Sequence, residues 1–121
     1  MAVKPWRALV TPFDGGGFKL VVWEGLADGD TGAPFVCAAY PDKTVQFLGT
    51  FGGAVTLEGT MNLDLEAAVY ATLNDPQGLP CSGVTSARVK NILEHVYALR
   101  PVAGAGVADV DVWLALATGG R

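Results

Sequence analysis

Short runs in which apolar and polar residues alternate recur along the chain, and Gly, Pro and Asp residues separate them. The clearest run is VADVDVWLALA, residues 107–117, where one set of alternate positions is aliphatic: Val110, Val112, Leu114 and Leu116. The opposite set consists of Asp109, Asp111, Trp113 and Ala115. A period of two residues is that of a strand with one buried face. The pattern therefore predicts a strand with Trp113 on its polar face.

A second stretch, residues 45–60, contains two alternating runs that meet at Gly52-Gly53. The residues expected to share the core face are Val45, Phe47, Val55 and Leu57. Leu48 falls on the opposite, polar face of the first run. A two-residue glycine link supplies the left-handed φ values of a tight hairpin turn. We therefore predict a β-hairpin over this stretch.

Other apolar runs, bounded by turn residues, predict further strands over 18–23, 35–40, 69–73 and 97–102. Between the first two of these, a loop rich in Gly and Asp is expected. Residues 61–68 fit either a loop or one helical turn. Residues 1–11 are expected to form an extended N-terminal arm or an edge strand.

One segment has helical spacing instead. Its apolar residues recur at i, i+3, i+4 and i+7, namely Val89, Ile92, Leu93 and Val96, and Ser86 is suited to cap a helix. This predicts one short helix that ends near His95. Several short strands joined by Gly and Pro turns are typical of an antiparallel sandwich. The predicted fold is therefore all-β: a single antiparallel β-sandwich domain over residues 1–121, with one short helix.

The composition narrows the function classes. Half of the 121 residues are hydrophobic, 17% are charged and the net charge is −4. The basic residues are scattered, which argues against nucleic acid as a partner because phosphate binding needs clustered Lys and Arg. No apolar run approaches the roughly 18 residues of a membrane span, and no secretory signal is recognisable, so a membrane is not expected as a partner. The low charge indicates that another molecule covers part of the surface.

Residues for catalysis or metal binding are few. His95 is the single histidine, and its expected place is the surface or a helix end; a nucleophile pair with Cys81 has no accompanying motif. Asp28 and Asp30 begin like a calcium loop, but no third Asp and no Glu follow at the required spacing, so a solvated turn is expected. We therefore expect no enzyme, no catalytic residue, no metal and no cofactor. Cys37 and Cys81 are expected as buried free thiols, and one bridge between them stays open as an alternative.

Aromatic residues are the better candidates for binding. Three tryptophans, Trp6, Trp23 and Trp113, suit either a sugar platform or, more commonly, a core or a protein interface. Trp113 and Leu48 lie on the polar faces of their strands, which makes them candidate partner contacts. Pro5 and Trp6 are further candidates, because an N-terminal arm can reach a neighbouring molecule.

With these residues described, a resemblance can be stated. The stretches TVQFLGTFGGAVTLEGT, YATLNDPQG and ALRPVAGAGVADVDVWLALA occur in this order. They resemble the capsid decoration, or cement, proteins of tailed bacteriophages, over roughly residues 44–117. The sequence departs from that pattern at MNLDLEAAVY, where a short Asn/Asp-Gly turn and a Trp are expected.

The resemblance implies a jelly-roll-like sandwich that binds the outside of an assembled phage capsid and braces neighbouring subunits of the major capsid protein. It also implies a homo-oligomer, a dimer or a trimer, that is made in the host cytoplasm and resides on the virion exterior. The alternative is another virion or tail component, such as a carbohydrate-binding adsorption module. That alternative requires an exposed aromatic platform, with Trp23, Trp113 or Tyr40 as candidates.

Overall fold

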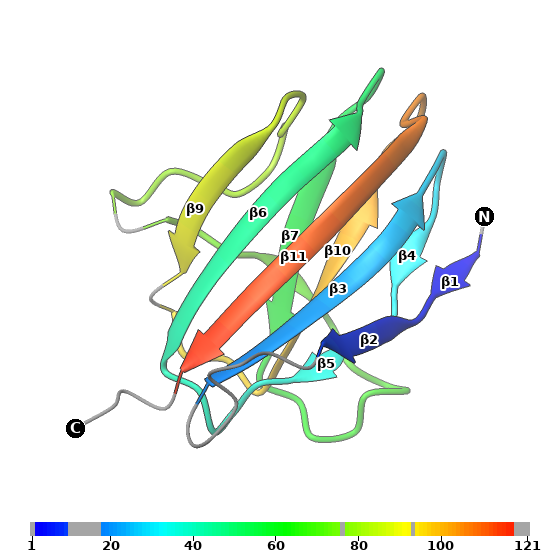
Figure 1. Cartoon of the computed structure of the whole chain (residues 1–121). Coiled ribbons are helices and arrows are strands. Elements are labelled where there is room, and N and C mark those ends of the chain that lie inside the picture. The colour runs from blue at the N-terminus through cyan, green and yellow to red at the C-terminus, as the bar shows by residue number, and fades with distance from the viewer. Residues whose placement is uncertain (1, 10–17, 76, 93, 118–121) are drawn as a thin grey trace.

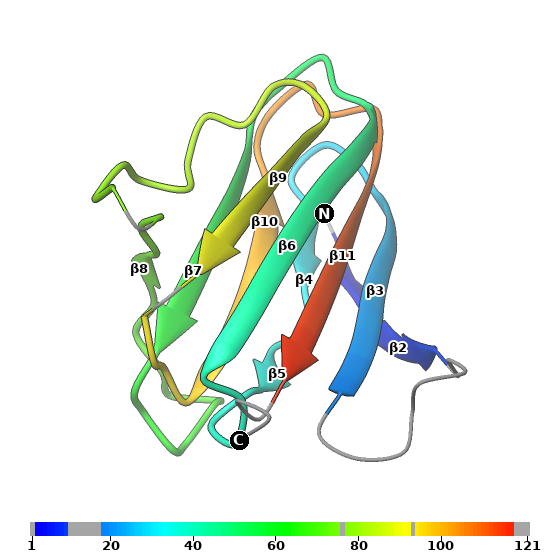
Figure 2. The ribbon, with the colours of Figure 1, turned by 60° about the vertical axis from the view of Figure 1, so that its left-hand side comes forward.

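The computed structural model describes residues 2–9, 18–75, 77–92 and 94–117, and within these ranges it contains strands and no helix. The strands form two sheets that pack face to face (Figures 1 and 2). The front sheet of Figure 1 has the order β2 (Trp6–Leu9), β3 (Phe18–Leu26), β11 (Asp109–Ala117), β6 (Asp42–Thr50) and β9 (Arg88–Ile92). The rear sheet has the order β1 (Val3–Lys4), β4 (Thr31–Gly32), β10 (Ala98–Ala103), β7 (Val55–Thr60) and β8 (Ala71–Thr72), and β5 (Phe35–Val36) also pairs with β10. The prediction of an all-β sandwich is confirmed.

The core lies between the two sheets and comes from the alternation seen in the sequence. In β11 the aliphatic positions are buried and the intervening positions are half-buried or exposed. Facing them from the rear sheet are inward residues of β7 and β10, among them Leu57 and Leu99, which have no exposed surface. Each strand thus buries every second side chain against the opposite sheet, which is the main stabilising contribution to such a sandwich.

The predicted hairpin at Gly52-Gly53 is wrong. Strands β6 and β7 form where expected, but β6 pairs with β11 and β9, whereas β7 pairs with β10 and β8. The chain therefore crosses from the front sheet to the rear sheet at the two glycines. The buried faces of the two strands point toward each other across the core. The alternation of apolar and polar residues is the same whether two strands pair in one sheet or face each other from two sheets, so it could not distinguish these arrangements.

A neighbouring connection makes the same crossing. Strand β10 belongs to the rear sheet and β11 to the front sheet, so the β10–β11 connection runs beside the β6–β7 connection. Two backbone hydrogen bonds join the connections: Gly104 N–H donates to Ala54 O (2.8 Å), and Ala108 N–H donates to Phe51 O (2.8 Å). Paired crossings of this kind give the sandwich its jelly-roll-like character.

The predicted short helix is also wrong, because Arg88–Ile92 forms β9 at the edge of the front sheet. Positions three apart lie on opposite faces of a strand, so Ile92 is buried while Val89 is 61% exposed. The segment forms a strand because the backbone at the open edge of β6 pairs with it. This pairing cannot be read from the spacing of apolar residues within the segment. The strand expected over 35–40 is shorter than predicted, since it ends at Val36 and Tyr40 N–H bonds back to Cys37 O (2.9 Å).

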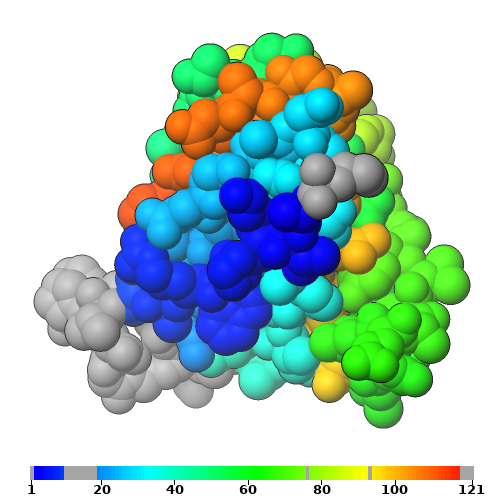
Figure 3. Space-filling model, turned by 90° about the vertical axis from the view of Figure 1, so that its right-hand side faces the viewer, coloured from blue at the N-terminus to red at the C-terminus, as the bar shows by residue number. Residues whose placement is uncertain are grey.

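The described part of the predicted N-terminal arm forms edge strands on both sheets. Strand β1 lies parallel to β4 in the rear sheet and β2 lies antiparallel to β3 in the front sheet, and both are dark blue in Figure 3. Asp30, which is 5% exposed, holds this segment in place. Its carboxylate accepts hydrogen bonds from Ala2 N–H (2.9 Å) and Ala27 N–H (2.9 Å), and Lys4 Nζ lies 3.9 Å away.

This arrangement predicts an acid-sensitive contribution to stability. The hydrogen bond from Ala27, that from Ala2 and the charge of Lys4 together hold the pKa of Asp30 below its usual value, although burial opposes them. Because the unfolded-state pKa is about 3.9, Asp30 stabilises the fold above that pH and loses its contribution as the pH falls through the lower folded-state pKa. The free energies of unfolding of the wild type and Asp30→Asn, measured in urea, should therefore differ by a constant amount above about pH 5. The difference should shrink as the pH falls below about 4. A difference that persists unchanged to about pH 2 would contradict the assignment.

Candidate functional site

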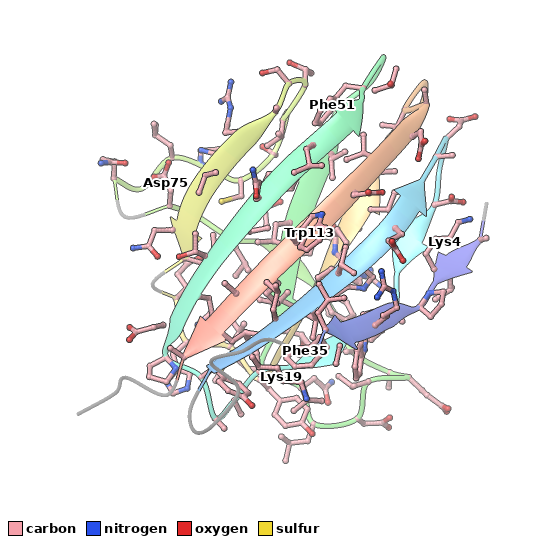
Figure 4. The ribbon with its side chains drawn as sticks, viewed as in Figure 1. Lys4, Lys19, Phe35, Phe51, Asp75 and Trp113 are labelled. Carbon is pink, nitrogen blue, oxygen red and sulfur yellow. The ribbon has the colours of Figure 1, made fainter. Side chains whose placement is uncertain are left out.

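The outer face of the front sheet, here called the front face, carries the candidate site. It consists of the outward side chains of five strands and is turned toward the viewer in Figure 1. The register of the strands places on it Arg7, Leu20, Val22, Glu24, Thr44, Gln46, Leu48, Val89, Asn91, Asp111, Trp113 and Ala115. Strand β11 is central, and Trp113 lies near the middle of the face in Figure 4.

The structure brings together two of the predicted contact residues, Trp113 and Leu48. In the β11–β6 register, Trp113 is opposite Gln46 and Asp111 is opposite Leu48, so the two apolar side chains are diagonal neighbours on adjacent strands. Both are half-buried. The front face therefore has an apolar centre at the position that alternation predicted.

Val22 belongs to the same centre and was missed by the sequence analysis. It is opposite Trp113 on the other side of β11, and it has no exposed surface although it points away from the core. Neighbouring side chains on the front face must therefore cover it. The continuous apolar run FKLVVW does not show by itself that one of its valines faces outward.

The indole nitrogen of Trp113 is in an unusual position. Trp113 Nε1 is buried and finds no hydrogen-bond partner among the described residues. An unpaired buried donor typically costs about 1–3 kcal/mol. The apolar surface that Trp113 gives the front face thus comes with a buried N–H donor that has no partner among the described residues.

Two charged side chains of the front face, Arg7 and Glu24, form an ion pair at its margin on β2 and β3. Arg7 Nε and Nη2 donate to the two carboxylate oxygens of Glu24, each at 3.0 Å. This hydrogen bonding lowers the pKa of Glu24 and raises that of Arg7. Asp111 accepts a hydrogen bond from Gly25 N–H (2.9 Å). Asp111 lies opposite Leu48 and forms no ion pair with a described residue, so a partner that covers the centre of the face also covers this carboxylate.

The dimensions of the front face suit a protein partner. Five strands spaced about 4.8 Å apart, each rising about 3.3 Å per residue, present on the order of 600 Å². One side of a standard specific protein interface covers about 800 Å². The face therefore approaches the area that one partner contributes to such an interface.

The other two predicted contacts are not part of this face. Trp6 is half-buried and packs on the core side, where its ring meets Phe35 edge-on at 4.9 Å and its Nε1 donates to Pro34 O (3.2 Å). Pro5 is exposed between β1 and β2. Trp6 thus ties the N-terminal strands to the sandwich.

The aromatic residues do not form a shared platform. Trp23 has no exposed surface, and its Nε1 donates to Ala33 O (2.9 Å). Tyr40 is partly buried against the core. Of the three candidates for a sugar platform, Trp113 is the one on the front face.

The residues considered for catalysis or metal binding lie apart from one another, are buried, or already form hydrogen bonds. His95 is exposed and its Nε2 lies 2.8 Å from Ala38 O, while the neighbouring Glu94 carboxylate accepts hydrogen bonds from Asn74. Cys37 and Cys81 are buried and free; burial raises the pKa of both thiols, that of Cys37 to about 11. Within the described ranges no group of three or more His, Cys, Asp or Glu side chains is placed to hold a metal ion.

The chain is thus a β-sandwich whose front sheet has an outer face with an apolar centre. No protein family and no curated protein matches the chain. Among solved structures, the SPBc2 prophage-derived protein YomS has a similar fold, with a TM-score of 0.63 and 11% identity over 91% of this chain and 98% of that one. An RmlC-like cupin family protein with a double-stranded β-helix fold from Methanocaldococcus jannaschii gives a TM-score of 0.52 and 12% identity over 95% and 80% of the two chains. No helix in the described part of the chain is long and apolar enough to cross a membrane.

Proposed function

We propose that this protein is a structural component of a bacteriophage particle that binds the outside of the assembled capsid and braces neighbouring major capsid protein subunits. The observation that carries this proposal is the front face, a broad surface with an apolar centre at Trp113, Leu48 and Val22 and with the Arg7–Glu24 ion pair at its margin. A rigid sheet of this kind suits an extended protein surface such as a shell. The fold that the chain shares with a prophage-derived protein supports the same proposal.

In this proposal the protein acts by binding and carries out no reaction. A molecule that binds only the assembled shell stabilises the shell by mass action. Self-association into a dimer or trimer at a symmetry axis of the shell would strengthen binding through avidity. The protein would be made in the host cytoplasm and would reside on the capsid exterior.

Another position in the particle, such as the tail, is the second candidate, because the likeness to a prophage-derived protein fits it equally well. As a carbohydrate-binding adsorption module the chain would depend on Trp113, since Trp23 is fully buried. A glycan array with Trp113→Ala as control would detect such binding.

Quantitative mass spectrometry of purified phage particles tests the proposal. A shell-bound protein is expected at a copy number close to that of the major capsid protein, because the shell repeats its binding site on every subunit group. A handful of copies per particle would favour the tail. Absence from purified particles would contradict both positions.

A further inference from the structure

A second surface of a different kind lies at the end of the sandwich where β7 leads into β8. The connecting segment, residues 61–70, is called here the tip; it is the bright green loop at the bottom of Figure 1 and the lower right of Figure 3. Three of its apolar side chains are among the most exposed of the described residues: Met61 at 70%, Leu63 at 73% and Val69 at 83%.

Local hydrogen bonds explain why these apolar side chains face solvent. Asn62 N–H donates to Thr60 Oγ1 (3.1 Å), Asp64 N–H to Asn62 Oδ1 (2.9 Å), and Glu66 N–H to Asp64 Oδ1 (3.2 Å). The polar side chains of the tip therefore accept hydrogen bonds from its own backbone N–H groups, as in Asx turns. The alternating apolar residues are left without a place in the core.

Two adjoining hollows border the tip. They have volumes of about 310 Å³ and 210 Å³, and Met61, His95 and Val96 line both of them. Val69 and Glu94 also line the first, and Leu63 also lines the second. Pockets for drug-sized molecules usually span about 300–1,000 Å³. The first hollow is at the lower limit of this range and the second is below it, so each is large enough for one or two side chains of a partner.

The exposed carboxylates of the tip and of Glu94, which lines the first hollow, lack a cationic partner among the described residues. Asp64, Glu66 and Glu94 are exposed, and none of them forms an ion pair with a described residue. Between Lys43 and Arg88 the sequence contains no Lys and no Arg. The ammonium of Lys43 acts on Glu94 only from a distance, because Lys43 is buried and its Nζ donates to the carbonyl oxygens of residues 40 and 41.

One further cation lies near the end of the tip. Arg100 stacks on the ring of Tyr70, with 3.7 Å from its Cζ to the ring centroid. Its guanidinium already pairs with Glu58 at 3.2 Å. Apolar side chains, side-chain-sized hollows and unpaired acidic groups thus occur together.

We propose that the tip binds a protein segment that inserts apolar side chains into the two hollows and places a Lys or Arg beside Glu94 and Glu66. Apolar anchors in small pockets supply most of the binding energy in such contacts, and complementary charge supplies specificity and association rate. The tip is built from elements that do not contribute to the front face. This proposal therefore stands or fails independently of capsid binding.

Selection of a displayed library of random 12-residue peptides against the purified full-length protein tests it. The enriched peptides are expected to combine two apolar residues with Lys or Arg. A synthetic copy of an enriched peptide should bind Leu63→Ser at least about tenfold more weakly than the wild type, as loss of an anchor predicts. The matched control is Leu79→Ser, since Leu79 is 59% exposed on a different loop, and its binding should be unchanged.

Charge reversal tests the acidic contribution separately. Glu66→Lys should weaken binding of the peptide and reduce the dependence of its affinity on salt. Asp109→Lys should change neither, because Asp109 is the first residue of β11 and that strand starts at the end of the sandwich opposite the tip (Figure 1). Val69→Ser provides a second apolar variant, and circular dichroism verifies that each variant is folded. The proposal is overturned if no peptide is enriched, if enriched peptides are acidic, or if they bind Leu63→Ser and Val69→Ser as tightly as the wild type.

Discussion

Replacing Gly53 with alanine should lower the free energy of unfolding by at least about 3 kcal/mol, the upper range for overpacking at a rigid site. A Cβ atom at Gly53 would overlap the carbonyl oxygen of Ala105 and lie 2.8 Å from Val107 N. These are backbone atoms of the β10–β11 connection, and the hydrogen bonds at Ala54 and Phe51 hold the two connections together. The neighbour therefore cannot move aside without the loss of those bonds. Urea denaturation of both proteins measures the difference.

Substitutions at two other glycines distinguish the cost of a steric overlap from the cost of a left-handed backbone conformation. Gly78 has a φ of 80°, and a Cβ there would meet nothing within 4 Å, so Gly78→Ala should cost only the roughly 1–2 kcal/mol of a left-handed alanine. Gly52 has a similar φ of 78°, and its Cβ would also lie 2.7 Å from Gly106 O, so Gly52→Ala should cost more than Gly78→Ala. If Gly53→Ala and Gly52→Ala cost no more than Gly78→Ala, the described contact between the two connections is wrong.

These glycines show what the sequence predicted and where its information ended. Alternation located β6, β7 and β11 and identified their buried faces, because those faces are set by local spacing. It did not identify which strands pair. Gly52-Gly53 suits a tight hairpin turn and also suits two connections that pass in contact, and only the arrangement of β10 and β11 distinguishes these roles.

The same limit applies to the short helix. The spacing of Val89 and Ile92 fits one face of a helix, yet in β9 the two side chains lie on opposite faces. The deciding factor is the open edge of β6, which pairs with β9 over five positions. That edge is supplied by a segment about 45 residues earlier in the chain, beyond the reach of local patterns.

The candidate surfaces were predictable to different degrees. Trp113 and Leu48 were identified because an apolar residue on the polar face of a strand is visible in the alternation. Val22 lies in a run that is apolar throughout, so its outward direction appears only in the register with β11. The tip was not identified, because the exposure of an apolar loop residue depends on whether the rest of the fold covers it.

Removing the indole of Trp113 should have the largest effect on partner binding. Trp113→Ala deletes the apolar centre of the front face and uncovers Val22, and loss of a central aromatic anchor commonly costs at least about 2 kcal/mol, or about 30-fold in affinity. Trp113→Phe retains an aromatic ring and removes the unpaired N–H. It should bind within a few-fold of the wild type and be no less stable.

Co-sedimentation of purified protein with expanded capsid shells that lack it, over a range of concentrations, measures whether the front face binds the capsid. The wild type and Trp113→Phe should saturate the shells, and Trp113→Ala should bind about 30-fold more weakly. Val102→Ala, a half-buried position on the outer face of the rear sheet, should bind as the wild type does. Capsid binding through the front face is excluded if the wild type never binds the shells, or if folded Trp113→Ala binds them as tightly as the wild type.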